Sequence, residues 1–425
     1  PVQLSNPPHG HGSRQLFQPR LLETRIACSL SLHPICALRT IMKRATYLRI
    51  TTVPESLSYL LEGQPQFLKK NGFEVLLASS GNRPSELSEF TFHSIPLSRT
   101  ISPIKDIKSI WELKSVLKKN KIDIIHSHTP KAGLIAMISG ALVRTPIRLH
   151  TVAGLPQDHA KRLTSIILNV TEFITYLFSH KVYFNSMTQM ESQKIKFKRF
   201  ENKFAVIHNG TSNGIDLSRF NLTANKSDLR TKLHLSTDVF YWIFIGRIHR
   251  HKGVIELIEA FNTFDRLNRG KSQLLIVGGL DDARTDLNYE WIKKTASENP
   301  NIKFLGFQSN VEEWLVAADT LVFPSYREGF PNVPLQAAVL GIPVLASDIN
   351  GCNEIVSHEK NGFLFPTQDS NSILSAMQRV FIDPSLRKNM SDWSKANIPQ
   401  KYDRTVFHKK LLLEYLSLLP SKRKK

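Results

Sequence analysis

The stretch that most constrains the fold is residues 321–356, LVFPSYREGFPNVPLQAAVLGIPVLASDINGCNEIV. Two short apolar runs in it predict buried strands, and the residues between them predict a turn and then a helix that ends at Gly341. Parallel strands need such a crossover, so the stretch predicts a βαβ unit of an α/β protein. The predicted elements are a strand at 321–323, a turn at 324–329, a helix at 332–340 and a strand at 342–346.

Glu328 is the residue of this unit that points to a function. It falls between the carboxyl end of a strand and the N-terminus of a helix, which is where open α/β sheets bind ligands. Pro331 is tolerated at the start of that helix, and backbone N–H groups between Phe330 and Val333 have no partner within it. These groups can donate hydrogen bonds to a sugar or phosphate oxygen.

The run Glu328-Gly329-Phe330-Pro331-Asn332 resembles the donor-site signature of the retaining GT-B glycosyltransferases of the group 1, or family-four, type. That family includes bacterial capsular, exopolysaccharide and lipid-linked oligosaccharide transferases. Its signature continues to a second Glu after seven further residues, and here Gln336 stands at that position. The alternative interpretation is a βαβ unit that serves only the fold.

The resemblance implies two Rossmann-like domains that face a cleft, with a C-terminal helix that returns to the first domain. The 425 residues agree with this, because they exceed one ordinary core. The expected parts are an extension at 1–41, an acceptor-binding domain at 42–222, a nucleotide-sugar-binding domain at 223–395, and a return helix with a basic tail at 396–425.

The extension at 1–41 does not resemble the rest of the chain. Its first half is rich in Pro and Gly, and His33 and Pro34 interrupt its mildly apolar second half, which disfavours a signal peptide. Met42 begins a basic segment that leads into the first strand, as a natural N-terminus would. We therefore expect residues 1–41 to be either a disordered extension or an artefact of a translation start placed too far upstream.

A second mark of the family follows the predicted strand at 240–245, in the run Gly246-Arg247-Ile248-His249-Arg250-His251-Lys252-Gly253. Gly246 would let another group approach the backbone. Arg247 and Lys252 would supply fixed positive charge to the diphosphate of a nucleotide sugar, without a metal or other cofactor. The alternative for these two residues is surface salt bridges.

Three polar segments of the first half resemble acceptor-domain loops of enzymes that extend polyprenyl-diphosphate-linked sugars. They lie at 126–133, 150–156 and 209–216, each after a predicted strand. The resemblance places His128, Lys131 and Asn209 on the acceptor side. His126 and His128 also suggest a metal site, but no carboxylate or Cys is spaced to complete it, so hydrogen bonding is the preferred interpretation.

Ala153 departs from the family, which usually has a histidine at this position near the donor sugar. His150 is the nearest replacement in the sequence, and a packed histidine at a strand end is the alternative for it. We expect the leaving phosphate to take the acceptor proton, which would make the missing histidine tolerable.

The charge of the chain is uneven. Residues 1–210 hold 28 Lys and Arg against 13 Asp and Glu, out of 56 and 36 in the whole chain. No nucleic-acid motif accompanies this excess, so we expect an anionic membrane surface and phosphorylated substrates as partners. The three cysteines, Cys28, Cys36 and Cys352, fit neither a zinc site nor a disulfide framework, which indicates a reducing compartment. We therefore expect a cytoplasmic protein, and its positive charge leads us to expect it at the inner face of the cell membrane as a peripheral protein.

The resemblance implies a glycosyltransferase that moves a sugar, with retention, from a nucleotide sugar (a UDP-sugar) to a lipid-linked or polysaccharide acceptor. Glu328 would hold sugar hydroxyls. Gln336 would hydrogen-bond the ribose, and its neutral amide would make weaker hydrogen bonds there than a carboxylate makes. Two alternatives stay open. One is another enzyme on this fold, such as a sugar-nucleotide 2-epimerase or a phosphorylase. The other is a nucleotide-sugar-binding protein without catalysis, in view of Ala153 and Gln336.

Overall fold

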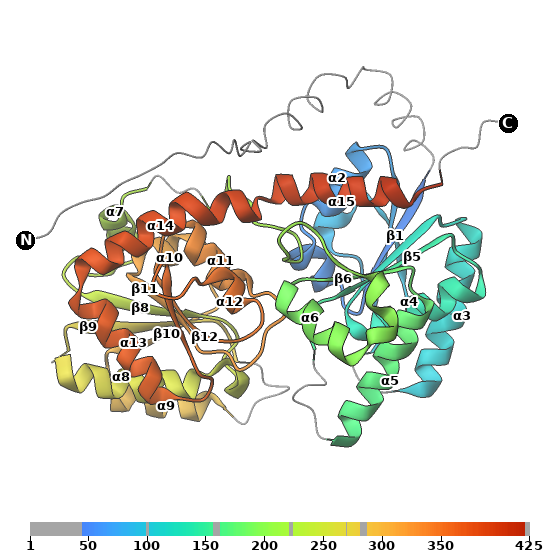
Figure 1. The fold of residues 1–425 in the computed structure, drawn as a ribbon. Coiled ribbons are helices and arrows are strands. Elements are labelled where there is room, and N and C mark those ends of the chain that lie inside the picture. Colours follow the sequence, from blue (N-terminus) through green and yellow to red (C-terminus); the bar gives the residue numbers. More distant parts are fainter. Residues whose placement is uncertain are drawn as a thin grey trace, which may run out of the picture.

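The computed structural model describes residues 45–98, 102–155, 162–220, 224–268, 270–280 and 287–420. Figure 1 shows two lobes side by side, with a pair of helices running along one edge of both. The extension at 1–41, the start at Met42 and the basic tail at 421–425 lie outside the described residues.

The first lobe is built on a seven-stranded parallel sheet in the order β3-β2-β1-β4-β5-β6-β7. Most of its strands are apolar runs that are buried on both faces, as parallel sheets require. The strands are β1 (Thr46–Thr51), β2 (Glu74–Ser79), β3 (Thr91–Ser94), β4 (Ile124–His128), β5 (Ile147–Val152), β6 (Lys181–Phe184) and β7 (Phe204–Val206). The α-helices are α2 (Gln64–Lys70), α3 (Pro103–Lys119), α4 (Pro130–Leu142), α5 (Arg162–Phe178) and α6 (Met187–Lys196).

The second lobe repeats this architecture with a six-stranded parallel sheet in the order β10-β9-β8-β11-β12-β13. Its strands are β8 (Phe240–Ile245), β9 (Ser272–Val277), β10 (Ile302–Gly306), β11 (Thr320–Phe323), β12 (Val344–Ser347) and β13 (Gly362–Phe365). Its helices are α7 (Lys226–Lys232), α8 (Val254–Asn268), α9 (Tyr289–Glu298), α10 (Val311–Ala317), α11 (Asn332–Val339), α12 (Cys352–Ile355) and α13 (Ser370–Ile382).

Strand β8 shows how the core of the second lobe is divided. Tyr241, Ile243 and Ile245 belong to the cluster on one face of the sheet, and Trp242 and Phe244 belong to the cluster on the other. This alternation follows from the two-residue period of a strand. Helices must therefore cover both faces, and the two predicted Rossmann-like units are confirmed.

The predicted return helix is also confirmed. Helix α14 (Pro384–Tyr402) packs on the second lobe, and α15 (Arg404–Leu418) crosses to the first lobe after a break at Asp403 (Figure 1). Phe407, Leu411 and Tyr415, four residues apart along one helix face, are buried in the core of the first lobe. The last helix thus belongs to the core of a domain that begins more than 300 residues earlier.

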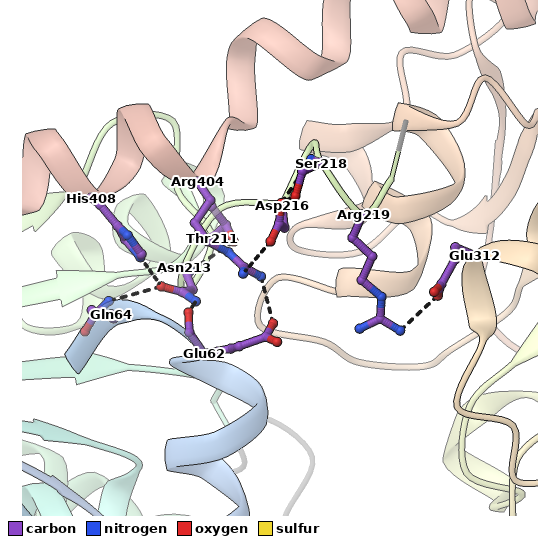
Figure 2. Close-up of polar contacts among 10 residues, drawn as sticks. All are labelled: Glu62, Gln64, Thr211, Asn213, Asp216, Ser218, Arg219, Glu312, Arg404 and His408. Atoms are coloured by element: carbon purple, nitrogen blue, oxygen red, sulfur yellow. Dashed lines mark hydrogen bonds and ion pairs between the residues drawn. The ribbon is translucent and has the colours of Figure 1, made fainter. Parts of the chain in front are cut away.

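Polar contacts hold the point where the chain crosses between the lobes (Figure 2). Arg404 donates to the Asp216 carboxylate at 3.3 Å and to the Glu62 carboxylate at 3.2 Å. The Asn213 side chain donates to the Glu62 carbonyl at 2.7 Å, and its amide oxygen lies 2.8 Å from Nε2 of the buried His408. The two crossing segments are therefore tied to each other and to the loop before α2.

Some elements differ from the sequence-based expectation. The sequence between β1 and β2 suggests one helix, but a π-helical turn at Ser56–Leu60 precedes α2, and Gly63, with φ of 75°, separates the two. Sequence reasoning missed β3, because it is a partly exposed edge strand, and α6, because few apolar side chains mark its buried face. Among the described helices, none is long and apolar enough to cross a membrane.

Candidate active site

Glu328 and Lys252 form an ion pair at the centre of the site. Glu328 lies in the turn between β11 and α11, and Lys252 ends a short 3-10 helix, η5 (Arg250–Lys252), that follows β8. The Glu328 Oε1 atom accepts hydrogen bonds from Lys252 Nζ and, at 2.8 Å, from the hydroxyl of Ser325. The Glu328 side chain is 17% exposed and that of Lys252 is 22% exposed, so a ligand can still reach both.

A glycine allows these two turns to approach each other. Gly253 has φ of +69°, and a Cβ atom on it would lie 2.1 Å from the carbonyl oxygen of Pro324. A larger residue would separate η5 from the turn after β11 and thereby move Lys252 away from Glu328. The last residue of the Gly246–Gly253 run therefore has a structural role that its position alone did not reveal.

The first lobe supplies the opposite wall of the site, from the end of β5. A Cβ atom on Gly329 would lie 1.8 Å from the carbonyl oxygen of Ala153, so the two lobes touch here. Between them is a cavity of about 690 Å³. Its lining includes Pro130, Ala153, Gly154 and Leu155 from the first lobe and Arg247, His249, His251, Lys252, Tyr326, Glu328 and Asp348 from the second.

The second-lobe wall of this cavity is rich in cationic and imidazole groups. Arg247 is exposed, and the rings of His249 and His251 stack with centroids 5.0 Å apart. The hydroxyl of Tyr326 donates to the Glu256 carboxylate at 2.5 Å, and its burial together with this carboxylate raises the Tyr326 pKa. The wall therefore offers positive charge beside the Glu328 carboxylate, as a diphosphate attached to a sugar would need.

The remaining donor-side residues lie around the N-terminus of α11. Pro331 is its N-cap residue, and no side chain caps the first turn. The Phe330 ring is buried against Tyr402, with centroids 5.4 Å apart, so only its backbone can serve a ligand. Asn332 and Gln336 line a different cavity, of about 420 Å³, together with Glu62 and Gly63 of the first lobe.

The structure does not bring the acceptor-side residues to the 690 Å³ cavity. Lys131 forms an ion pair with Asp106 at 2.6 Å, and the side chain of Asn209 donates to the Lys401 carbonyl at 2.9 Å. His128 is fully buried, with Nδ1 3.1 Å from the Arg49 guanidinium. Their predicted contact with an acceptor remains a prediction.

His150 also lies away from the cavity. Its ring is fully buried against Gly133 of α4, and Nδ1 lies 2.9 Å from the Ser127 hydroxyl. Burial and the charge of Arg49 lower the His150 pKa to about 3, so the ring is neutral. Ala153 lines the cavity together with Glu328, and His150 does not, so His150 does not replace the histidine that the family usually has at position 153.

The histidines of β4 are held by hydrogen bonds. His126 lies 2.5 Å from the Tyr415 hydroxyl through Nδ1 and 2.7 Å from the Thr151 hydroxyl through Nε2. Burial lowers the pKa of both His126 and His128 well below the usual range. Within the described part of the chain, no group of three or more His, Cys, Asp and Glu is placed to hold a metal ion.

Sequence reasoning missed Ser325 and Glu354. Ser325 positions the Glu328 carboxylate through its hydroxyl, and a Ser three residues before the Glu was the only signal. Glu354 accepts from backbone N–H groups of the first lobe, 166 and 167 positions earlier in the chain. No local pattern could have indicated that contact.

Family models and relatives agree with this geometry. The model described as "Glycosyl transferases group 1" matches residues 225–396, and the one described as "Glycosyltransferase Family 4" matches residues 66–219. The chain is 29% identical to the capsular polysaccharide biosynthesis glycosyltransferase CapM of Staphylococcus aureus, over 89% of this chain and 98% of that protein. It is 31% identical to the UDP-Gal:alpha-D-GlcNAc-diphosphoundecaprenol alpha-1,3-galactosyltransferase of Escherichia coli, over 68% of this chain and 74% of that protein.

Solved structures share the fold. The Anabaena protein Alr3699/HepE, in complex with UDP, has a TM-score of 0.73 at 18% identity, covering 88% of this chain and all of that one. WaaG, a glycosyltransferase involved in lipopolysaccharide biosynthesis, has a TM-score of 0.67 at 14% identity, covering 87% of this chain and 98% of that one. Two parallel Rossmann-like sheets and a returning C-terminal helix are thus a GT-B fold. The chain belongs to the glycosyl transferases group 1 family and is a glycosyltransferase.

Proposed function

We propose that this glycosyltransferase moves a sugar from a UDP-sugar, with retention of anomeric configuration, to a polyprenyl-diphosphate-linked acceptor in surface polysaccharide biosynthesis. The observation that carries the proposal is the Glu328–Lys252 pair, which lies beside Arg247 in a cavity between the lobes. The names of relatives support it. One acts on a diphosphoundecaprenol-linked sugar, and a Campylobacter jejuni relative is an N,N'-diacetylbacillosaminyl-diphospho-undecaprenol alpha-1,3-N-acetylgalactosaminyltransferase.

In the proposed mechanism, the cationic side chains act on the diphosphate and the Glu328 carboxylate acts on the sugar. The bond between the anomeric carbon and the diphosphate oxygen breaks, and Arg247 and Lys252 stabilise the negative charge that grows on the diphosphate. The acceptor oxygen bonds to the anomeric carbon from the same face, and its proton passes to the leaving phosphate oxygen. Glu328 accepts hydrogen bonds from sugar hydroxyls and stabilises positive charge at the anomeric carbon.

The 420 Å³ cavity is the proposed place for the nucleoside. Gln336 lines it and would hydrogen-bond the ribose, while Asn332 and Gly63 lie at the same cavity. Asn332, the first residue of α11, lines this cavity, and Glu328 and Gly329, just before the helix, line the other. Backbone N–H groups at the start of α11 can therefore serve the phosphates between nucleoside and sugar.

We also propose that transfer needs no metal, because Arg247 and Lys252 line the cavity and can neutralise the diphosphate in place of a divalent ion. Activity should survive dialysis against EDTA. If EDTA abolishes transfer and Mg²⁺ or Mn²⁺ restores it, the cations do not suffice.

The test is an assay of the full chain with isotopically labelled UDP-hexoses and UDP-N-acetylhexosamines and undecaprenyl-diphosphate-linked acceptors. We expect a labelled lipid product from one donor, with a coupling constant by nuclear magnetic resonance that shows the donor's own anomeric configuration. Inversion would refute retention. Tight UDP-sugar binding without transfer to any acceptor would favour the non-catalytic alternative, and release of a 2-epimer or a sugar phosphate would favour the other enzymes.

A further inference from the structure

Helix α5 of the first lobe has its apolar face directed to solvent. Leu163, Ile166 and Val170 are 72%, 52% and 53% exposed, and Phe173 and Leu177 continue the row. Spacings of three and four residues place them on one helix face. The buried face instead carries Glu172, Thr175 and Tyr176. This inverted arrangement shows that the apolar face does not serve the core of the lobe.

Helix α3 repeats the feature. Ile104, Ile107 and Trp111 are 85%, 57% and 60% exposed, at spacings of three and four residues. Helices α3 and α5 pack on either side of α4, so they belong to one layer. We name Ile104, Ile107, Trp111, Leu163, Ile166 and Val170 the apolar rim. Scattered single apolar residues need no explanation, whereas ordered apolar rows on two helices of one layer indicate an interaction site.

The apolar rim lies at the same end of the lobe as the 690 Å³ cavity. Helices in a parallel α/β layer begin at the carboxyl ends of the strands, and the rim residues occupy the N-terminal halves of α3 and α5. Figure 1 shows the N-terminal end of α5 extending beyond the rest of the first lobe. Leu155 lines the cavity, and α5 begins at Arg162, so few residues separate the cavity from the rim.

Positive charge surrounds the apolar rim. Lys105 and Arg162 are exposed beside it, and the Lys114 ammonium lies 4.1 Å from the centre of the Trp111 ring. The nearby acidic residues of α3 are neutralised, since Asp106 pairs with Lys131 and Glu112 with Lys108. Residues 162–171 of α5 contain no acidic side chain at all.

We infer that the apolar rim docks on an anionic bilayer, with its large side chains at the boundary between headgroups and acyl chains and its cations against lipid phosphates. Interfacial helices bind membranes through this combination of apolar and basic side chains. The inference deepens the proposed function, since a bilayer at the rim brings a lipid-linked acceptor to the cavity beside it. A second copy of the chain is a poorer occupant, because two rims would bring like charges together.

The test is co-sedimentation of the full chain with vesicles of phosphatidylcholine alone and with added phosphatidylglycerol, at low and high salt. We expect binding to the anionic vesicles that weakens as salt rises. The triple variant Leu163→Ser, Ile166→Ser, Val170→Ser should lower the bound fraction at least about tenfold. These side chains are exposed, so the melting temperature should stay unchanged, and the matched control is Phe307→Ser, an exposed apolar residue of the second lobe that is 78% exposed.

Equal vesicle binding by the triple variant and the original chain would overturn the inference, as would equal binding to neutral and anionic vesicles. A concentration-dependent dimer in analytical ultracentrifugation, lost in the triple variant while vesicle binding persists, would assign the rim to a second copy. Vesicle binding needs no turnover, so this test can succeed even if the proposed reaction is wrong. If both hold, the triple variant should lose activity on acceptor in vesicles and keep it on a short-chain acceptor in solution.

Discussion

The carboxylate of Glu354 in the second lobe accepts a hydrogen bond of 2.9 Å from the backbone N–H of Thr188 in the first lobe. Its other oxygen accepts one of 3.0 Å from the N–H of Met187, the first residue of α6. A negative charge at a helix N-terminus is favourable, and here the charge and the helix belong to different lobes. The contact therefore ties the second lobe to the N-terminus of α6 in the first lobe.

We expect Glu354→Gln to loosen this contact, because the amide keeps the shape but loses the charge and one acceptor. The lost interaction is worth about 0.3–1 kcal/mol, which shifts the distribution between closer and more open lobes. Small-angle X-ray scattering should show a larger radius of gyration, and the apparent donor KM should rise. Glu359→Gln is the control, since Glu359 pairs with Arg379 inside the second lobe. An unchanged scattering curve for Glu354→Gln would show that other contacts set the lobe spacing.

Gly214→Ala tests the crossing point shown in Figure 2, where Gly214 precedes the residue that pairs with the start of α15. Gly214 has φ of +64°, and an added Cβ would lie 2.6 Å from Cα of Arg404. We expect a loss of about 2 kcal/mol or more in the free energy of unfolding. Gly81→Ala is the matched control, because Gly81 has φ of +67° with nothing within 4 Å of a Cβ. Equal losses in chemical denaturation would mean that the backbone relaxes around the collision.

Arg247→Ala and Lys252→Ala should each lower kcat by about 100- to 1000-fold, because the leaving diphosphate loses a fixed charge partner. The comparison is Arg250→Ala, since Arg250 shares η5 with Lys252 but does not line the cavity. Steady-state kinetics and a melting curve of each variant separate catalysis from folding. Near-normal turnover in both cavity variants would remove the cations from the mechanism.

Glu328→Gln keeps the shape of the side chain and removes its charge. If charge stabilisation at the anomeric carbon dominates, kcat should fall strongly while the Kd for the donor changes little. If Glu328 only holds the sugar, affinity for the intact donor should fall and affinity for UDP should not. A purely structural role, through the bonds of Glu328 to Lys252 and Ser325, would lower Tm and leave turnover unchanged. Isothermal titration, kinetics and melting of this variant distinguish the three cases.

Glu172 makes stability depend on pH. Burial raises its pKa to about 7, and its Oε2 atom has no hydrogen-bond partner. The folded state therefore holds the Glu172 proton more tightly than the unfolded state does. The contribution of Glu172 to the free energy of unfolding is therefore most favourable at low pH and is lost as pH rises from about 4.5 to 7. We expect Glu172→Gln to raise the free energy of unfolding at pH 8 by up to about 3 kcal/mol and to change it little at pH 4. Glu191→Gln, at an exposed position of α6, is the control, and equal pH profiles of Glu172→Gln and the original chain would contradict the assignment.

The sequence determined the order of most elements and the position of the donor signature. The turn and helix around Glu328 follow from local signals: apolar runs of strand length, Pro331 at a helix start and Gly341 at φ of 76° after its end. Such signals act over a few residues, so they are present in the sequence itself. The same reasoning missed α6, where few apolar side chains mark the buried face.

Only the tertiary structure decided which side chains reach the cavity. Whether His150 or Ala153 faces Glu328 depends on where β5 ends and on which helix covers each face of the sheet, and α4 covers the face of His150. The outward face of α5 is equally a matter of packing, because Glu172 rather than Ile166 is turned toward the lobe. Contacts such as Glu354 to Thr188 join residues 166 positions apart. Local propensity carries no information about such pairs, since they arise only where the two lobes pack against each other.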